Sequence, residues 1–253
     1  MELKNKVIAI TGAAQGLGLA MAQSFAEAGA NVALIDMQED VVKAAADSIS
    51  ALGVKAMGYA LDVTDEAAVE LAFAQIAQDF GQLNGLINSA GIMRDGMLLK
   101  VKEGKVVSKM SKQQFQSVMD VNVTGTFLCS REAATQMIQT NSHGVIINLS
   151  SVSRGGNMGQ TNYSASKSAV ATMTVSWAKE LARFNIRTGC IAPGLVNTAM
   201  AAQMRPEMRD KFLASVPAGR LADVAELGHA AKFIFENDYF TGRTLELDGG
   251  TRV

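Results

Sequence analysis

The sequence predicts an α/β fold: a single-domain, doubly wound, seven-stranded parallel sheet with helices on both faces. Short apolar, β-branched runs alternate along the chain with longer segments of helical periodicity. Parallel strands need crossover connections, and helices of this length supply them. No linker rich in Pro, Ser or Gly divides the 253 residues, and the chain holds only 3 prolines. One domain spanning residues 1–253 is expected, because α/β folds of roughly 250 residues often form a single domain.

Each expected strand is a short apolar run, and each expected helix is a longer stretch with the 3.6-residue period. The strands are expected at Val7–Thr11, Asn31–Asp36, Lys55–Asp62, Gly85–Ser89, Gly144–Ser150, Arg187–Ala192 and Thr244–Asp248. The helices are expected at roughly 16–29, 38–52, 65–80, 111–141, 162–184 and 223–237.

Capping residues support several of these helix boundaries. Thr64 and Ser111 precede helical runs, and Gln114 follows Ser111 at the spacing of a capping box. Glycines 29, 53 and 81 each follow a helical run where a left-handed C-cap is expected.

One segment interrupts the alternation of strand and helix. Residues 98–109 alternate roughly between polar and apolar around Glu103-Gly104. This pattern predicts a small β-hairpin between the fourth strand and the following helix. A solvated charged loop is the alternative interpretation.

The composition excludes several classes of function. With 23 Lys and Arg against 24 Asp and Glu, the net charge of −1 favours neither nucleic acid nor an anionic membrane as a partner. Apolar runs such as Val7–Ile10 are far shorter than the roughly 18 residues of a membrane span. No secretory signal is expected, because Met1-Glu2-Leu3-Lys4 provides no basic region before an apolar one. Cys129 and Cys190 indicate reduced thiols, and two histidines without ligand spacing argue against a metal site. A cytoplasmic location is expected.

A glycine turn after the first strand predicts a phosphate-binding site. In Thr11-Gly12-Ala13-Ala14-Gln15-Gly16-Leu17-Gly18 the first glycine permits a tight turn and the second a close approach of backbone to a pyrophosphate. The third lets the helix pack against the strand, and the free N–H groups at the helix start face the phosphates. Asp36, at the end of the second strand, is placed to accept hydrogen bonds from ribose hydroxyls. The alternatives to a phosphate-binding site are an ordinary glycine-containing turn and an aspartate that is only solvated at the end of its strand.

A tyrosine and a lysine four residues apart are a common pair, and they indicate acid–base chemistry only beside a redox cofactor. Tyr163 and Lys167 lie on one face of a helix. A nearby Lys⁺ and an oxidised nicotinamide both favour the phenolate, which can take a proton from an alcohol. Ser151 ends a strand at the edge where open parallel sheets bind ligands, and is preferred to Ser150, which points the other way. Asn122 lies within a helical pattern; a kink that frees a carbonyl for a water, or an interhelical hydrogen bond, explains it.

The spacing Thr-Gly-x-x-x-Gly-x-Gly, followed in order by the other landmarks, resembles the short-chain dehydrogenase/reductase family from residue 6 to the C-terminus. Those landmarks include Asp62-Val63, Asn88-Ser89-Ala90-Gly91 and Pro193-Gly194. The resemblance implies that Tyr163 is the acid/base and that Lys167 holds the nicotinamide ribose and lowers the pKa of the tyrosine. It also implies that Ser151 positions the carbonyl oxygen and that Asn122 anchors a water in a proton relay.

The same resemblance implies a Rossmann-type coenzyme site. Asp62 and Val63 would contact the adenine, Asn88 and Gly91 the adenosine side, and Thr198 the carboxamide. The full implied set is Gly12, Gln15, Gly16, Leu17, Gly18, Asp36, Asp62, Val63, Asn88, Ala90, Gly91, Tyr163, Lys167, Pro193, Gly194, Val196 and Thr198. Two features depart from the family pattern: Ser89 replaces the usual second Asn, and residues 98–109 resemble an insertion.

The expected coenzyme is NAD(H). Asp36 ends the second strand where the 2′ position of the adenosine is expected, and Gln15 lies where many NADP-using relatives have a basic residue. Met37 and Gln38 offer no cation to a 2′-phosphate, although Lys43 is a flexible cation nearby.

The substrate is expected to be a ketone or secondary alcohol, of 3-oxoacyl or 3-hydroxyacyl type or similarly apolar. A substrate lid is expected at 195–217, where Met200, Met204, Met208, Phe212 and Leu213 either cover an apolar substrate or only pack the lid. A 3-oxoacyl-[acyl-carrier-protein] reductase is the alternative, although the places where carrier-docking arginines are expected fall near Thr135 and Phe184. A non-catalytic dinucleotide sensor is a further alternative.

A homotetramer is the family habit, and the sequence supports self-association. In the helix expected at 162–184, a stripe of small residues lies apart from an apolar stripe, so two faces are suited to burial. The small stripe is Ala165, Ala169, Thr172 and Ser176, and the apolar stripe is Val170, Met173, Trp177 and Leu181.

Overall fold

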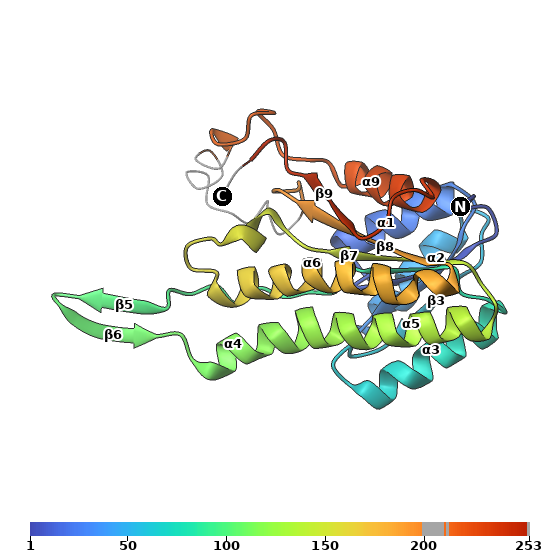
Figure 1. Ribbon diagram of the computed structural model, residues 1–253, viewed down its shortest axis with the longest axis horizontal. Coiled ribbons are helices and arrows are strands. Elements are labelled where there is room, and N and C mark those ends of the chain that lie inside the picture. The colour runs from blue at the N-terminus through green and yellow to red at the C-terminus, as the bar shows by residue number, and fades with distance from the viewer. Residues whose placement is uncertain (199–209, 211–212, 252–253) are drawn as a thin grey trace.

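The computed structural model describes residues 1–198, 210 and 213–251, and it confirms the predicted sheet (Figure 1). Seven parallel strands lie in the order β3-β2-β1-β4-β7-β8-β9, the doubly wound order that results when crossovers run outward from a central strand. Their bounds are β1 (Val7–Thr11), β2 (Asn31–Asp36), β3 (Ala56–Ala60), β4 (Gly85–Asn88), β7 (Gly144–Leu149), β8 (Ile186–Pro193) and β9 (Arg243–Leu247).

Helices cover both faces of this sheet. One face carries α1 (Gly16–Glu27), α2 (Glu39–Ser50) and α9 (Val224–Glu236), whose Phe25 and Phe235 rings meet edge to face at 5.0 Å. The other face carries α3 (Glu66–Phe80), α4 (Lys112–Met119), α5 (Thr126–Gln139) and α6 (Thr161–Leu181). Short turns η2 (Val152–Gly155) and η3 (Ala182–Phe184) flank α6.

The central strand β1 shows why the two cores form. Its side chains alternate, so Ile8 and Ile10 enter the core under α1 and α9, whereas Val7 and Ala9 enter the core under α3 and α5. All five residues of β1 are buried, as expected for a strand covered on both faces.

Some predicted boundaries were wrong, and local hydrogen bonds explain them. The third strand ends at Ala60 instead of Asp62, because the Asp62 side chain turns back to accept from the backbone N–H and the hydroxyl of Thr64. The next helix is capped by Asp65, not Thr64, since Asp65 accepts from the N–H of Ala68 at 3.1 Å. Ser111 does cap α4, but the side chain of Gln114 donates to the Arg94 and Asp95 carbonyls instead of closing a capping box.

The long helix expected at 111–141 is three segments. A π-helical stretch, η1 (Asp120–Gly125), separates α4 from α5. Such bulges often mark functional sites. Gly81 caps α3 with φ of +74°, and Gly29, with φ of +83°, directly follows the Ala28 cap of α1. Gly53 also has positive φ, +87°, but lies two residues beyond the Ala51 cap of α2.

The predicted β-hairpin is confirmed. Strands β5 (Leu99–Lys102) and β6 (Lys105–Lys109) pair antiparallel and project from the body beyond the start of α4 (Figure 1). Glu103 and Gly104 both have positive φ, 51° and 75°, which is the type I′ turn typical of two-residue hairpins. Separately, within the described part of the chain no helix combines the length and apolar character needed to cross a membrane.

Candidate active site

The glycine turn after β1 is tightly packed against the end of β4. A Cβ on Gly18 would lie 2.2 Å from the Gly12 carbonyl oxygen, and one on Gly12 would lie 2.9 Å from the Cα of Ala90. The Thr11 hydroxyl oxygen accepts from the backbone N–H groups of Ser89 and Ala90, both at 3.1 Å. The turn is therefore held by the residues that follow β4, whereas Gly16 is exposed, with no atom within 4 Å of where a Cβ would stand. Gln15 precedes α1 and is exposed, and Leu17 is partly exposed in its first turn.

The Asp36 carboxylate is held over this turn. It accepts from the N–H of Ala14 and from the N–H of Gln38, each at 3.2 Å. These two bonds orient the carboxylate at the end of β2 and leave acceptor capacity on both oxygens. Lys43, the flexible cation nearest in sequence, instead pairs with Glu39 on the exposed surface of α2.

The end of β4 presents a buried amide with an unused acceptor. Asn88 donates to Ser130 at 2.9 Å and to the Asn148 oxygen at 2.8 Å. Its own Oδ1 is buried and accepts no hydrogen bond from the described residues. Such an orphaned acceptor costs free energy unless a ligand supplies a donor. Val63 is buried and its side chain packs against Gly125 in η1.

The π-helical segment explains the position of Asn122. Its side-chain amide pairs with both backbone groups of Ile92, at 2.8 and 3.0 Å, and donates to the Ser166 hydroxyl on α6 at 3.0 Å. The helix is distorted at Asn122 and the predicted interhelical hydrogen bond is present, whereas the water at its carbonyl stays a prediction. The backbone carbonyl of Asn122 accepts from the Thr126 hydroxyl at 2.8 Å and has a second lone pair.

Tyr163 and Lys167 lie together on α6, as predicted. The Lys167 ammonium lies 5.6 Å from the centre of the Tyr163 ring and donates to the Leu149 carbonyl at 2.7 Å. Lys167 is only 6% exposed, and burial lowers its pKa to about 8. Burial also raises the pKa of the Tyr163 phenol, which a hydrogen bond with the Ser151 side chain opposes and the charge of Asp95 reinforces. Burial therefore favours the protonated form of Tyr163, the form that can donate a proton.

The structure brings Ser151, not Ser150, to the tyrosine. Ser150 donates its hydroxyl to the Lys167 carbonyl at 2.7 Å and points away from the site. Ser151 hydrogen-bonds with Tyr163 and accepts from the N–H of Ser153 at 3.1 Å. Serine, tyrosine and lysine thus form one cluster at the carboxyl edge of the sheet, where ligands bind in this architecture.

The segment after β8 is described in part. The N–H of Gly194, after Pro193, donates to the Leu247 carbonyl at 2.9 Å, and a Cβ at Gly194 would meet Asp248 at 3.0 Å. Val196 is buried and bridges to Ala222; Thr198 is the last described residue before the gap. Of the predicted lid, Met200, Met204, Met208 and Phe212 lie outside the described residues.

Sequence reasoning missed two groups beside Tyr163. Asn162 is fully buried; its amide nitrogen donates to the Arg94 carbonyl at 2.9 Å and its oxygen accepts from the Tyr163 N–H at 2.9 Å. Asp95 accepts from Gln160 at 2.9 Å and acts on the tyrosine through its charge. An Asn in the first turn of a helix was a weak signal for the former, and nothing in the sequence pointed to Asp95.

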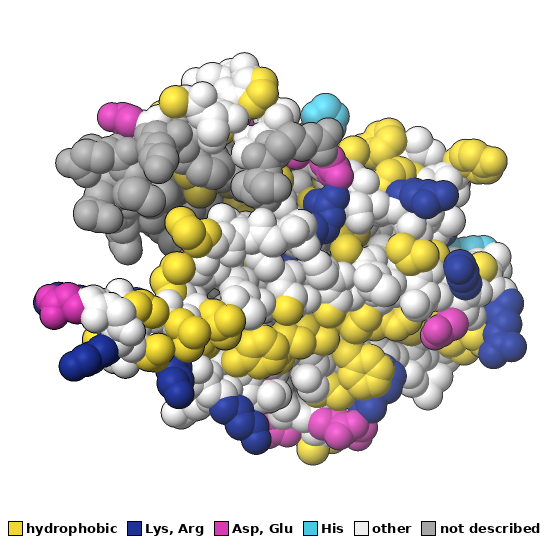
Figure 2. Space-filling view, turned by 60° about the vertical axis from the view of Figure 1, so that its left-hand side comes forward, with side chains coloured by type: hydrophobic (Ala, Val, Ile, Leu, Met, Phe, Trp, Pro, Cys, Tyr) yellow, Lys and Arg dark blue, Asp and Glu magenta, His cyan; other side chains and the backbone are white. Residues whose placement is uncertain are grey.

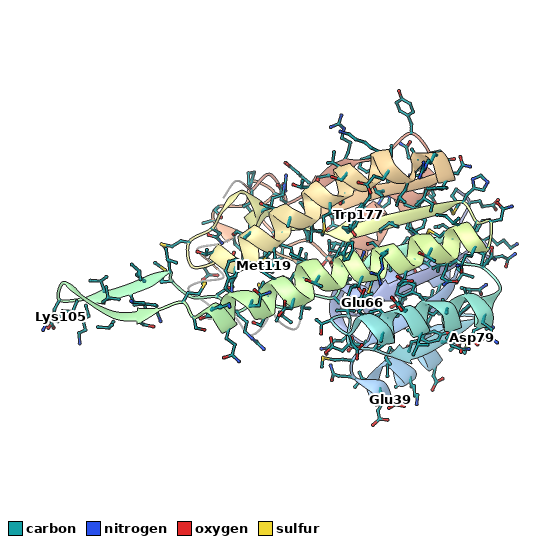
Figure 3. The ribbon with its side chains drawn as sticks, turned by 60° about the horizontal axis from the view of Figure 1, so that its bottom comes forward. Glu39, Glu66, Asp79, Lys105, Met119 and Trp177 are labelled. Carbon is teal, nitrogen blue, oxygen red and sulfur yellow. The ribbon has the colours of Figure 1, made fainter. Side chains whose placement is uncertain are left out.

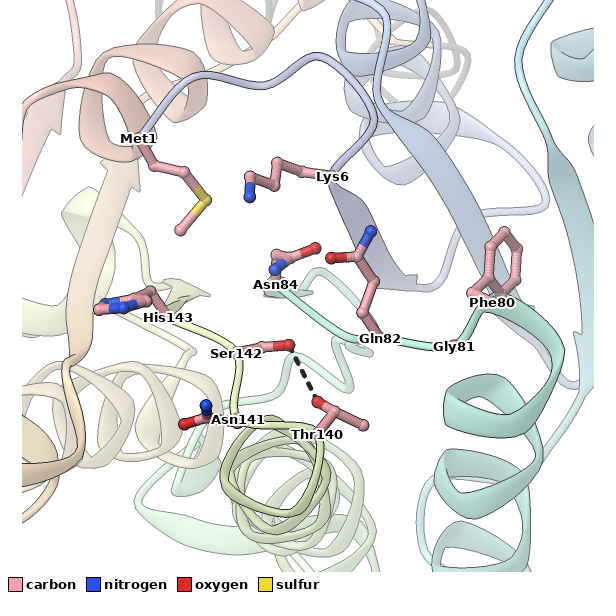
Figure 4. A pocket seen from close by; sticks show the side chains of 10 residues that line it. All are labelled: Met1, Lys6, Phe80, Gly81, Gln82, Asn84, Thr140, Asn141, Ser142 and His143. Carbon is pink, nitrogen blue, oxygen red and sulfur yellow. Dashed lines mark hydrogen bonds between the residues drawn. The ribbon is translucent and has the colours of Figure 1, made fainter.

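A separate cavity of about 360 Å³ lies at the opposite edge of the sheet (Figure 4). Lys6, Asn84 and His143, which precede β1, β4 and β7, contribute to its lining. It contains none of the predicted site residues, and Asn84 there holds the N–H of Val7 at 3.0 Å. Its position at the amino ends of the strands separates it from the cluster of Ser151, Tyr163 and Lys167.

The fold and the clustered side chains define a class of protein, an α/β oxidoreductase that acts on CH–OH groups with a nicotinamide dinucleotide. The family model described as short chain dehydrogenase matches residues 6–209, and the chain belongs to the short-chain dehydrogenase family.

Relatives of similar length agree with this. The chain is 36% identical over 253 residues to the 3-oxoacyl-[acyl-carrier-protein] reductase FabG of Thermotoga maritima, covering 99% of each chain. It is 37% identical to the protein of the same name from Vibrio cholerae, covering 99% of this chain and 98% of the relative. It is also 36% identical to the (2S)-[(R)-hydroxy(phenyl)methyl]succinyl-CoA dehydrogenase subunit BbsD of Thauera aromatica, with the same coverage.

Proposed function

We propose that this protein interconverts 3-oxoacyl and 3-hydroxyacyl thioesters with NAD(H). The observation that carries the proposal is the cluster of Tyr163, Ser151 and Lys167 at the carboxyl edge of the sheet, beside the π-helical Asn122. Relatives named as acyl-carrier-protein reductases and as a CoA-thioester dehydrogenase support the substrate class. A 3-oxoacyl-[acyl-carrier-protein] reductase is one specific form of this function.

The residues present fit a nicotinamide coenzyme. Asn88 keeps a buried acceptor without a described donor, and the ammonium of Lys167 has three protons, of which Leu149 takes one. Gly16 has positive φ and open space where a Cβ would stand, so its backbone is free to approach a pyrophosphate. The coenzyme, when bound, supplies or accepts the hydride. We propose that the binding set named from the sequence holds it.

In the reduction direction, the Tyr163 hydroxyl donates a proton to the carbonyl oxygen of the substrate. Ser151, already hydrogen-bonded to Tyr163, binds the same oxygen and holds it in line with the phenol. In the oxidation direction, the phenolate takes the proton of the alcohol. A positioned acid of this kind accelerates reactions by about 10²–10⁴.

Lys167 and Asn122 support this proton transfer. The lysine charge stabilises the phenolate that remains after donation, and its spare N–H groups are available to the ribose. The free lone pair of the Asn122 carbonyl is available to a water that returns a proton toward the lysine. The pairing of the Asn122 side chain with Ile92 and Ser166 holds that carbonyl in place.

A preference for NAD(H) follows from Asp36. Its carboxylate is anchored at the glycine turn, and Lys43 is engaged with Glu39 on the surface of α2. Two unit charges about 4 Å apart repel by about 4 kcal/mol at an effective dielectric near 20, before screening. A quarter of that repulsion, together with lost bonds to the ribose hydroxyls, gives a preference of about tenfold or more for NAD(H) over NADP(H).

We also propose a homotetramer in the cytoplasm. Apolar side chains stay exposed on the helical face, with Phe127 and Ile138 on α5 and Val175 on α6 each about two-fifths exposed. Figure 2 shows hydrophobic side chains gathered in a band across the face from which the hairpin projects. A contact between copies along α5 and α6 buries such a band.

The test is a direct assay. The protein is mixed with NADH and a panel of 3-oxo thioesters and simple ketones, and NADH consumption is followed by absorbance. Consumption that depends on the thioesters, and that Tyr163→Phe abolishes, is the expected result. No consumption above the substrate-free rate with any thioester contradicts the proposed function.

A further inference from the structure

The β5–β6 hairpin is an exposed arm with no covering element. All nine residues of its two strands are exposed, and the arm stands clear of the body with Lys105 at its tip (Figure 3). An isolated two-stranded hairpin is marginally stable in water. A well-formed turn that presents so much side-chain surface is suited to contact another molecule.

The two sides of the arm differ in chemistry. Leu99 and Val101 stand on one side of β5, and Val101 is paired with Val106, so this side is mainly apolar, with Lys109 opposite Leu99 at its base. The side chains of Leu99, Val101 and Val106 are 47%, 61% and 50% exposed, respectively. The other side carries the pair Lys102 and Lys105 and the pair Lys100 and Ser108, so it is basic.

The charge of the arm is distinct from that of the chain. Residues 99–109 hold four Lys and one Glu, a net charge of +3 in a chain of net −1. None of the lysines at 100, 102, 105 and 109 forms an ion pair with a described residue. Lys and hydrophobic side chains gather at this end of the molecule in Figure 2. The arm therefore complements an acidic partner that has an apolar patch.

The base of the arm is part of the wall of the active site. The N–H of Gly96 donates to the Gly159 carbonyl at 2.7 Å, and Gln160 donates to Asp95 at 2.9 Å. Asp95 acts on Tyr163 through its charge, and Asn162 joins the same wall to the tyrosine backbone. The arm is therefore connected directly to the segment that adjoins Tyr163.

The helical positions considered earlier offer less unpaired positive charge, because Arg131 is paired with three glutamates and Arg183 alone adjoins Phe184 among the described residues. Thr135 on α5 hydrogen-bonds to the Arg131 carbonyl, and Phe184 is an exposed aromatic ring in η3. The arm instead carries four lysines that form no ion pair with a described residue. Lys100, Lys102 and Lys105 share one side of the hairpin, and the exposed Val101 and Val106 stand on the other, so the arm presents charged and apolar surface together. An apolar centre with a charged rim is also typical of protein interfaces.

We propose that the β5–β6 hairpin is the docking arm for an acidic carrier protein that presents the thioester substrate to Tyr163. The inference rests on the proposed reduction of 3-oxoacyl thioesters. The carrier's acidic surface contacts Lys100, Lys102 and Lys105, its apolar patch contacts Val101 and its neighbours, and its acyl arm enters past Asp95 and Gln160.

The test compares one acyl group on three carriers. The 3-oxobutanoyl group is presented on a purified acidic bacterial acyl carrier protein, on CoA and on N-acetylcysteamine. Steady-state kcat and KM are measured for the full chain and for the double variant Lys102→Glu/Lys105→Glu. This pair is chosen because the two residues face each other, so the substitution exchanges one like-charge pair for another and preserves the turn. The matched control is Lys4→Glu/Lys232→Glu, which makes the same charge change before β1 and on α9.

We expect the tip variant to raise the KM for the protein-linked substrate about tenfold or more, with kcat and the two small thioesters unchanged within twofold. The KM of the unmodified protein for the carrier substrate should rise with salt, and that of the tip variant much less, because exposed charge contacts are screened. The control variant should behave as the unmodified protein does.

Three results overturn the inference. An unchanged KM for the carrier substrate in the tip variant removes the docking role. A KM that rises equally for CoA shows that the arm binds the nucleotide. A changed oligomer size of the variant, measured by light scattering, assigns the arm to contacts between copies. In each of these cases the N-acetylcysteamine thioester is still reduced by the unmodified protein; if it and both other thioesters are inert, the proposed function fails instead.

Discussion

Replacing the buried lysine of the active site should stabilise the coenzyme-free protein. Burial lowers the pKa of Lys167 from 10.5 to about 8, and at 1.36 kcal/mol per pKa unit this costs about 3 kcal/mol of folding free energy near pH 7. Lys167→Met removes that cost and keeps an unbranched side chain of similar length. It also leaves the Leu149 carbonyl without its donor, a loss of about 1–2 kcal/mol. The net gain expected at pH 7 is about 1–2 kcal/mol.

The pH dependence identifies the cause. The unfolded chain keeps this lysine protonated up to pH 10.5, whereas the folded chain releases the proton near pH 8. Between these values the unfolded state binds more protons, so the free energy of unfolding of the unmodified protein rises with pH. The Lys167→Met variant lacks this rise in the free energy of unfolding, because it has no ammonium at this position. Its advantage is therefore largest below pH 8 and is lost, or reversed by the missing hydrogen bond, above pH 10.5.

The assay is equilibrium unfolding in urea at a series of pH values between 7 and 10.5, without coenzyme. Lys179→Met, an exposed lysine of the same helix, is the control, and it should change stability little at any pH. The difference in the free energy of unfolding between the Lys167→Met protein and the unmodified one should change by about 3 kcal/mol over this pH range. A variant that is less stable at pH 7, by an amount independent of pH, would refute the assignment of a strained buried ammonium. The same variant should lose nearly all turnover.

Three further predictions follow from the site. Tyr163→Phe should lower kcat by about 10²–10⁴ while the Kd for NADH stays within twofold; more than a tenth of the original kcat would show that another group is the acid. Asp36→Ala should narrow the ratio of kcat/KM between NAD(H) and NADP(H) from about tenfold or more toward unity; equal values in the unmodified protein would contradict the role of Asp36. Gly18→Ala should cost about 1–3 kcal/mol or more, because its Cβ would lie 2.2 Å from the Gly12 carbonyl oxygen, and coenzyme titration should show weakened binding; a Kd equal to that of the unmodified protein would disprove this packing argument.

The sheet and the hairpin were predictable because their signals are local. An apolar run such as Val7–Ile10 specifies a buried strand by itself, and Glu103-Gly104 predicts a tight turn from two residues that accept positive φ. The positions of Tyr163 and Lys167 on one helix face likewise need only the helical period.

The π-helical segment could not be predicted from the sequence, because contacts with segments distant in the chain accompany it. Asn122 distorts the helix where its amide meets the backbone of Ile92 and the hydroxyl of Ser166, which lie 30 and 44 residues away. Propensity alone makes an Asn in a helix unfavourable and does not say what will satisfy it. Asn162 and Asp95 were missed for the same reason, since each acts on Tyr163 through contacts with segments distant in sequence.

These tertiary contacts explain why the site is costly to the folded chain and receptive to a ligand. Burial disfavours the charged forms of both Lys167 and Tyr163, and Asn88 keeps a buried oxygen without a described donor. All three unfavourable features lie at the carboxyl edge of the sheet, where a dinucleotide offers hydroxyl donors and acceptors to satisfy them. Binding should therefore relieve strain that the free protein carries, and saturating NADH should stabilise the unmodified protein by RT ln(1 + [L]/Kd). The Lys167→Met protein has already lost part of that strain and a ribose contact, so its stabilisation by NADH should be smaller although its coenzyme-free stability is higher.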